Sequence, residues 1–160
     1  MRGRGLAVLW LALLWVFVSV AAAEAPVRTV VINEVELNPD GFDRDAEWVE
    51  ILNVGATAVD LAGWALTYDY PIDGAAVISS ASLVLRPGQR HVFRYEGLRL
   101  RNDDRIVLRL LDAAGAVIDE TGPLRDVYDN DKTWQRIPDG GDPLLPLWLL
   151  RDGTKNAPNA

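Results

Sequence analysis

The stretch TVVINEVELNPDGFDRDAEWVEILNVG, residues 29–55, carries the clearest structural signal in the chain. Its opening run, residues 29–37, is rich in Val and is followed by the turn dipeptides Asn38-Pro39 and Asp40-Gly41. Residues 47–53 form a second apolar run, which ends at another turn containing Asn and Gly. Short β-branched runs bounded by such turn residues predict two β-strands joined by a loop.

The rest of the chain repeats this pattern of short apolar runs and turns. Further runs span residues 58–69, 82–96 and 104–120, and one more strand is expected around residues 133–137. We interpret Gly63 as a bend, Pro87-Gly88 as a turn and Ala114-Gly115 as a hairpin tip. No window keeps a helical period for long. The spacing of the runs therefore predicts an all-β sandwich or barrel.

Residues 1–23 have the features of a secretory signal peptide. Arg2 and Arg4 precede an apolar stretch, and Ala21 and Ala23 suit cleavage by a signal peptidase. The alternative is an uncleaved N-terminal membrane anchor, because the apolar stretch is just long enough to span a bilayer. Under both interpretations we expect the remainder outside the cytoplasm, either secreted or held at the membrane by this segment alone.

The composition limits what the remainder can do. The chain has no cysteine, so disulfides do not contribute to its stability. Of 16 basic residues, Arg2 and Arg4 leave with the first segment, so 14 basic residues face 23 acidic ones and the net charge is −9. An acidic chain of this kind is not a default nucleic-acid binder. We expect a sandwich over residues 27–138 and an extended C-terminal tail over residues 139–160.

Residues 32–66 resemble the opening of a lamin tail domain of the type found in secreted bacterial and archaeal proteins. The resemblance rests on an Ile-x-Glu strand, the Asn-Pro turn, EWVE and DLAGW, and it continues through LRPGQRHVF, DRIVLRLLDAAGAVID and TWQRIPDGGD. It ends at GTKNAPN, where Lys155 and Asn156 stand in place of the usual Pro-Gly. The resemblance implies an immunoglobulin-like β-sandwich and an interaction module with no activity of its own.

Catalytic residues are hard to assemble from this sequence. After the first segment the only serines are Ser79, Ser80 and Ser82, and the only histidine is His91, which lies within a strand-like run. Nucleophilic catalysis needs a nucleophile, a base and an orienting group in one place. A pair of carboxylates would be sufficient for acid–base catalysis, but nothing in the sequence indicates a cleft or a carboxylate with a raised pKa. We therefore predict no enzymatic activity and no catalytic residue.

Calcium is the cofactor that the acidic loops would suit best, because hard cations prefer several carboxylate and carbonyl oxygens. Alternation along a strand prevents all the carboxylates of residues 40–50 from converging, and leaves Asp40, Asp43 and Glu47 as the candidate ligands. A second acidic stretch carries Asp126, Asp129 and Asp131. The alternative is that these acids only satisfy the backbone of turns and that no cofactor is bound.

Arginines are concentrated between residues 86 and 109, whereas acids dominate residues 34–60. Three interpretations follow: surface ion pairs between neighbouring strands, a dipolar molecule that docks on copies of itself or on an acidic partner, or a face that binds polyanions such as nucleic acid. The candidate residues for such partner or polyanion binding are Arg90, Arg94, Arg99, Arg101, Arg105 and Arg109.

The tryptophans divide into two predicted roles. Trp48 and Trp64 lie in strand-like runs and are expected in the core, while Trp134 and Trp148 are expected to pin the tail against the sandwich. The sequence as a whole favours a non-catalytic extracellular interaction or scaffolding module that binds protein partners or itself. The alternatives are an accessory domain that engages polyanions in extracellular nucleic-acid metabolism and a calcium-stabilised adhesin.

Overall fold

The computed structural model describes residues 29–42, 46–68, 74–94, 100, 102, 105–141 and 147–160. None of these segments forms a helix that could cross a membrane. The described residues form eleven strands: β1 (Val30–Glu36), β2 (Trp48–Asn53), β3 (Val59–Asp60), β4 (Ala65–Tyr68), β5 (Gly74–Val77), β6 (Val84–Leu85), β7 (Arg90–Phe93), β8 (Leu108–Leu111), β9 (Val117–Glu120), β10 (Lys132–Ile137) and β11 (Leu147–Asp152). The predicted signal peptide or anchor lies outside the described residues.

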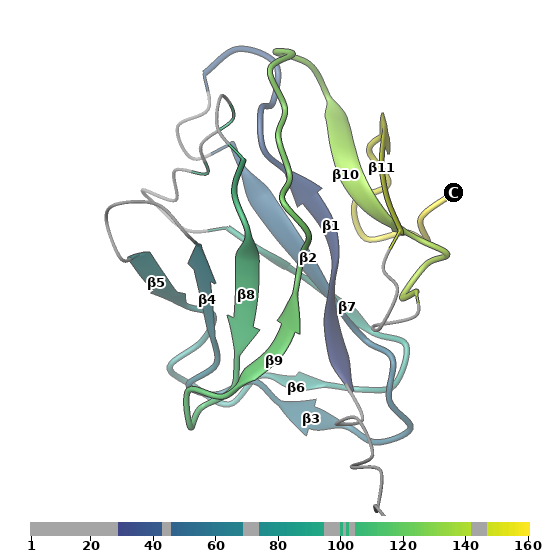
Figure 1. The fold of residues 1–160 in the computed structure, drawn as a ribbon. Coiled ribbons are helices and arrows are strands. Elements are labelled where there is room, and N and C mark those ends of the chain that lie inside the picture. Colours follow the sequence, from purple (N-terminus) through teal and green to yellow (C-terminus); the bar gives the residue numbers. More distant parts are fainter. Residues whose placement is uncertain are drawn as a thin grey trace, which may run out of the picture.

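Two antiparallel sheets form the layers of the molecule (Figure 1). One has the strand order β11-β10-β1-β2-β7 and the other has the order β5-β4-β8-β9. A short third sheet pairs β3 with β6 below them (Figure 1). The all-β, immunoglobulin-like prediction is confirmed, including the strands read from residues 29–37 and 47–53, which pair with each other as β1 and β2.

The core lies between the two main sheets. Every residue of β1 and β2 is buried, and β1 has an irregular register between Ile32 and Glu34. Apolar side chains from both layers fill the interior, and burying each contributes about 1.5–3 kcal/mol. They include Val30, Ile32, Val35, Val49, Ile51, Trp64, Leu66, Phe93, Ile106, Leu108 and Leu110.

The run at residues 58–69 forms two strands instead of one. Gly63 has a φ of 76°, a conformation that glycine adopts at low cost, and Trp64 N donates to Leu61 O across 3.0 Å. This turn redirects the chain, so that β3 pairs with β6 while β4 pairs with β5 and β8. The bend expected at Gly63 is thus the point where the chain passes from one sheet to another.

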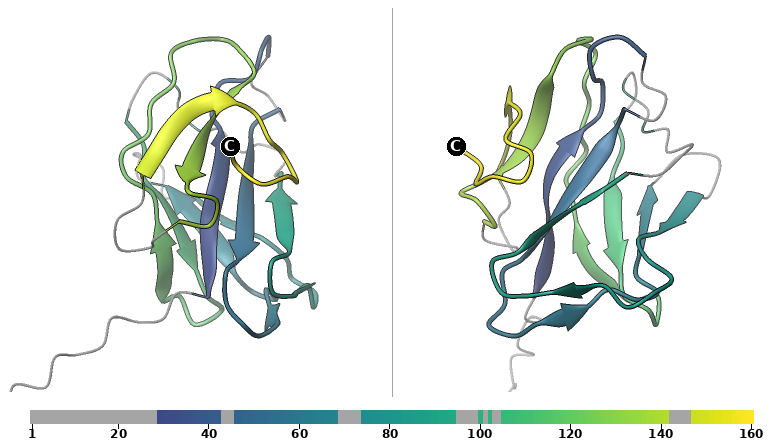
Figure 2. Two further views of the ribbon diagram at one scale, coloured as in Figure 1. Left: turned by 90° about the vertical axis from the view of Figure 1, so that its right-hand side faces the viewer. Right: turned by 180° about the vertical axis from the view of Figure 1, so that it is seen from behind.

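The C-terminal residues are more regular than the sequence indicated. Residues 139–160 were expected as an extended tail pinned against the sandwich, and residues 147–152 of this stretch form β11, which pairs with β10 from Lys132↔Asp152 to Ile137↔Leu147. The C-terminal segment, residues 153–160, then folds back across the face of the five-stranded sheet that points away from the core (Figure 2). We call this face the outer face. The strand expected around residues 133–137 is confirmed as β10.

The tryptophans only partly follow the prediction. Trp64 belongs to the core cluster, and Trp134 and Trp148 pack against it. Trp48 is buried, with 5% of its surface exposed, but it lies outside that cluster. It pairs in register with Glu36 on the outer face, because side chains of a strand alternate between the two faces of a sheet.

Candidate functional site

The outer face carries buried carboxylates that the C-terminal segment satisfies. Glu34 Oε1 accepts hydrogen bonds from Thr133 Oγ1 at 2.6 Å and from Thr154 N at 2.7 Å. Glu50 Oε2 accepts one from Asn156 N at 2.7 Å. Since a buried carboxylate without partners is costly, these bonds explain why the segment lies against the sheet.

A second set of bonds fastens the end of the segment. The side-chain amide of Asn159 donates to Asn33 O at 2.9 Å and to Arg136 O at 3.0 Å. Asp139 Oδ1 accepts from Asn159 N and from Asn33 Nδ2, both at 3.0 Å, and Asp139 also pairs with Arg90. The segment is therefore bonded to β1, β10 and the turn after β10.

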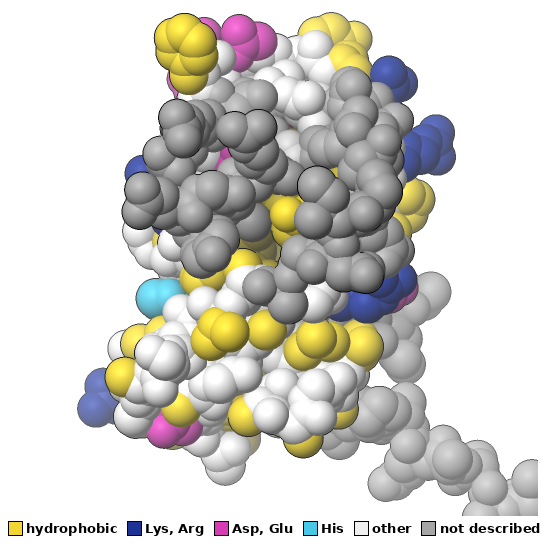
Figure 3. Space-filling model, turned by 90° about the vertical axis from the view of Figure 1, so that its left-hand side faces the viewer, with side chains coloured by type: hydrophobic (Ala, Val, Ile, Leu, Met, Phe, Trp, Pro, Cys, Tyr) yellow, Lys and Arg dark blue, Asp and Glu magenta, His cyan; other side chains and the backbone are white. Residues whose placement is uncertain are grey.

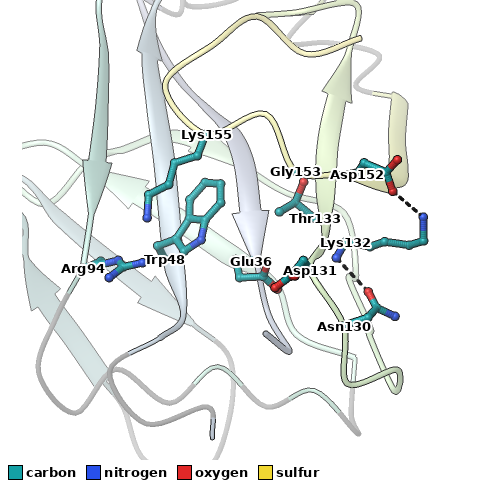
Figure 4. Close-up of a pocket in the computed structure, with 10 residues that line it drawn as sticks. All are labelled: Glu36, Trp48, Arg94, Asn130, Asp131, Lys132, Thr133, Asp152, Gly153 and Lys155. Atoms are coloured by element: carbon teal, nitrogen blue, oxygen red, sulfur yellow. Dashed lines mark hydrogen bonds and ion pairs between the residues drawn. The ribbon is translucent and has the colours of Figure 1, made fainter. Parts of the chain in front are cut away.

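A groove opens on the outer face where this segment leaves the sheet. Its volume is about 650 Å³, and Figure 4 shows the residues around it. They come from the ends of β1, β2, β7, β10 and β11 and from the segments that follow or precede them: Glu36, Trp48, Arg94, Asn130, Asp131, Lys132, Thr133, Asp152, Gly153 and Lys155.

Cations line one side of the groove. Lys155 Nζ lies 4.7 Å from the centroid of the Trp48 ring, within the range of a cation–π interaction. Arg94 lies on the same side of this ring (Figure 4). Burial and the neighbouring Arg94 lower the pKa of Lys155, and attraction to Glu36 and Glu34 opposes this shift less strongly.

Acids line the other side. Glu36 and Asp131 point toward each other (Figure 4), and Glu36 Oε1 accepts a hydrogen bond from Asn38 N at 3.2 Å. Burial, with repulsion from Asp126 and Asp131, raises the pKa of Glu36 from 4.5 to about 7. Lys132 bonds the third acid of the groove, Asp152, at 2.8 Å. Arg94 and Lys155 thus lie across the groove from Glu36 and Asp131, while Lys132 is paired with Asp152 on the acidic side.

Residues 23–124 match the family model for the lamin tail domain. The chain belongs to the lamin tail domain family. No curated protein matches it closely enough to add a more specific relationship. The match ends before β10, so β10, β11 and the C-terminal segment of this lamin tail domain lie beyond the matched residues. The family consists of non-catalytic modules, and the predicted resemblance is confirmed.

Two of the three candidate calcium ligands fall on described residues of the lamin tail domain. Asp40 is exposed, and Glu47 is buried with its Oε2 accepting a hydrogen bond from Leu100 N at 2.8 Å. Asp43 lies outside the described residues. Among the residues that the structure does describe, no three His, Cys, Asp or Glu side chains gather closely enough to hold a metal.

The four candidate arginines that the structure describes do not share one face. Arg90 forms an ion pair with Glu50 at 3.2 Å and is largely buried, while Arg94 is exposed at the end of β7. Arg105 is exposed and precedes β8 of the other sheet. Arg109 lies within β8 and pairs with Glu120 at 2.5 Å. Arg99 and Arg101 lie outside the described residues. The prediction grouped residues that are close in sequence but that the topology divides between two layers.

Sequence reasoning missed Lys155 and Glu36 as site residues. One feature of the sequence did point to Lys155: it stands, with Asn156, in place of the Pro-Gly that the resemblance leads one to expect in the final turn. The following residue, Asn156, keeps the left-handed backbone that Gly favours, with a φ of 61°. Glu36 gave no signal, because an acid in an alternating strand is expected to face solvent. The acids that raise its pKa, Asp126 and Asp131, are about ninety residues away in the sequence.

The two acidic loops at the upper end of the molecule in Figure 1 contact each other. Gly41 N donates to Asp129 Oδ1 at 2.9 Å, and Asn130 N donates to Asn38 O at 3.2 Å. Their apolar side chains point outward: Phe42 is 92% exposed and Tyr128 is 66% exposed. Figure 3 shows apolar side chains beside acidic ones at this end. We call these two loops, residues 37–42 and 125–131, the loop end.

Proposed function

We propose that this lamin tail domain is a non-catalytic extracellular interaction module that binds a protein partner through its loop end. The observation that carries the proposal is the exposure of Phe42 and Tyr128 on two loops that are hydrogen-bonded to each other. Aromatic side chains are enriched at the centres of protein interfaces, where few residues supply most of the binding energy. Residues 1–23, read as a signal peptide or anchor, support an extracytoplasmic location.

The charge around these aromatic residues indicates the kind of partner. Asp40, Asp129 and Asp131 are exposed beside Phe42 and Tyr128 in sequence. A partner with an apolar pocket and a basic rim would complement this surface, because opposite charges across an interface increase the association rate and exclude other partners. A polyanion is disfavoured here by the same charges and by the division of the described candidate arginines between two sheets.

Site-specific photo-crosslinking tests the proposal. A benzophenone amino acid replaces Phe42, Tyr128 or, as a control, Val117, which is 54% exposed in β9. The protein crosslinked on producing cells is identified and purified, and its affinity is measured for the wild type and for Phe42→Ala, Tyr128→Ala and Val117→Ala. We expect each loop-end substitution to weaken binding by about tenfold or more and the control to leave binding unchanged.

Two results would contradict the proposal. One is crosslinking from position 117 in preference to positions 42 and 128. The other is a purified partner whose affinity is unaffected by Phe42→Ala and Tyr128→Ala. Crosslinking between two copies of the chain through the loop end would identify the partner as the protein itself, and sedimentation of the same variants would then show loss of the dimer.

A further inference from the structure

Arg94 and Lys155 form a pair of like charges beside Trp48, on one wall of the groove (Figure 4). Arg94 follows β7, and Lys155 follows β11. These two elements lie at opposite edges of the five-stranded sheet. The C-terminal segment crosses the outer face and brings Lys155 over the Trp48 ring. The fold therefore places two cations together that would otherwise be far apart.

Neither cation forms a close ion pair with an acid of the described residues, although Glu36 and Glu34 attract Lys155 from a greater distance. Arg90, Arg109 and Lys132 each form an ion pair with a carboxylate. No such pair involves Arg94 or Lys155 among the described residues, and Arg94 is itself the largest charge effect on Lys155. Two neighbouring cations repel each other, so an anion placed between them would be stabilised by both.

The groove favours a small ligand with a single negative charge. Its volume of about 650 Å³ lies within the range of small-molecule sites. The opposite wall carries Glu36 and Asp131, and the whole chain has a net charge of −7. Both would repel a dianionic phosphate or a long polyanion more than a single carboxylate. A carboxylate also matches the planar fork of an Arg side chain.

We propose that the groove binds a small carboxylate ligand, with the carboxylate held between Arg94 and Lys155 at the edge of Trp48. Arg94 and Lys155 do not belong to the loop end, although Asn130 and Asp131 of the loop end line the opposite wall of the groove. The variants below therefore change the groove without changing Phe42 or Tyr128. The carboxylate can belong to an acidic sugar or to an acidic side chain of a peptide.

Titration followed by two-dimensional NMR tests the proposal. The probes are galacturonate and N-acetyl-glutamate amide, and the matched neutral controls are galactose and N-acetyl-glutamine amide, all at constant ionic strength. We expect saturable shifts of the Trp48 indole N–H and of the Lys155 and Asn156 amides with at least one acidic probe and none with the neutral controls. The acidic probe that saturates at the lower concentration identifies the source of the carboxylate.

Variants make the test specific. Arg94→Gln and Lys155→Gln should each weaken binding by about tenfold, because each removes one charge-assisted hydrogen bond. Lys155→Arg should retain binding, and Arg109→Gln, on the other sheet, should not change it. Arg94 is exposed, so Arg94→Gln tests the site even where Lys155→Gln loosens the C-terminal segment. Linear shifts without saturation, equal shifts with the neutral controls, binding of inorganic phosphate alone, or full binding by Arg94→Gln would each overturn the proposal.

Discussion

The backbone N–H of Asn156 donates a hydrogen bond to Glu50 Oε2 across 2.7 Å. It thereby joins the C-terminal segment to β2, a strand within the residues that match the lamin tail domain. Burial raises the pKa of Glu50, and the hydrogen bonds from Asn33 and Asn156 oppose that shift. The segment therefore acts as a cover whose backbone supplies the donors that buried carboxylates require.

Removing residues 153–160 should destabilise the protein by more than about 3 kcal/mol, because Glu34 and Glu50 would lose partners while staying within the sheet. Urea unfolding monitored by tryptophan fluorescence measures the loss. Glu34→Gln/Glu50→Gln in the truncated chain should recover part of it, since a neutral amide costs less to bury. Asp152→Asn, which breaks an exposed pair with Lys132, should have little effect. A truncated chain as stable as the full one would contradict the role of the cover.

The conformation of Asn156 gives a more local prediction. Its φ of 61° lies in the left-handed region, which Gly occupies freely and Asn tolerates. Asn156→Gly should leave the free energy of unfolding within about 0.5 kcal/mol of the wild type, whereas Asn156→Val should cost about 1–2 kcal/mol. Chemical denaturation of both variants provides the comparison. Equal stability of the two would show that the turn takes another conformation in solution.

These two cases show what the sequence could and could not reveal. The strands β1 and β2 were predictable, because alternation and turn residues are local signals. The partners of the buried Glu34 and Glu50 were not predictable, because they come from a segment about a hundred residues away whose composition is typical of a loose tail. The groove escaped detection for the same reason. Its cations come from β7 and from the C-terminal segment, and only the fold brings them together.

The raised pKa of Glu36 predicts how the free energy of unfolding depends on pH. Its pKa is about 7 in the folded state against 4.5 as the ordinary value, so between these pH values the folded state binds more protons than the unfolded state. Stability should therefore fall as the pH rises from about 4.5 to about 7, and Glu36 alone accounts for roughly 3 kcal/mol of that fall. Glu36→Gln should remove this part of the dependence, since the amide can still accept from Asn38 N.

Urea unfolding at several pH values measures the effect. The difference in the free energy of unfolding between the wild type and Glu36→Gln should change between about pH 4.5 and pH 7 and become constant above pH 7. Asp126, whose pKa is also raised by burial, contributes a dependence of the same sign that both proteins share. A difference that stays constant from pH 4 to pH 8 would mean that Glu36 ionises normally.

Calcium should not stabilise the protein through the predicted ligands. Glu47 is buried and its Oε2 already accepts from Leu100 N, while Asp40 is exposed. Thermal unfolding of the metal-stripped protein, with and without added calcium, checks this expectation. We predict no saturable shift of Tm. A shift that saturates with calcium and disappears in Asp40→Asn would instead support a site that uses Asp40 and Asp43.

The buried pair of Arg136 and Asp119 connects the two sheets at the irregular register of β1. Arg136 Nε donates to Ile32 O at 2.7 Å, and Asp119 Oδ2 accepts from Ile32 N at 2.8 Å and from Arg136. Both side chains are fully buried, and the guanidinium lies 5.0 Å from the centroid of the Trp148 ring. Arg136→Met or Asp119→Leu alone should therefore cost about 3–5 kcal/mol, because each leaves an unmatched charge in the interior.

The double variant distinguishes a charge effect from simple loss of packing. Arg136→Met/Asp119→Leu should cost less than the sum of the two single variants by at least about 1 kcal/mol, since no unmatched charge remains. The exposed pair of Arg109 and Glu120 is the matched control, and its double variant should change stability by less than about 1 kcal/mol. Additive costs at Arg136 and Asp119 would indicate that their bonds to Ile32, and not the ion pair, hold the two sheets together.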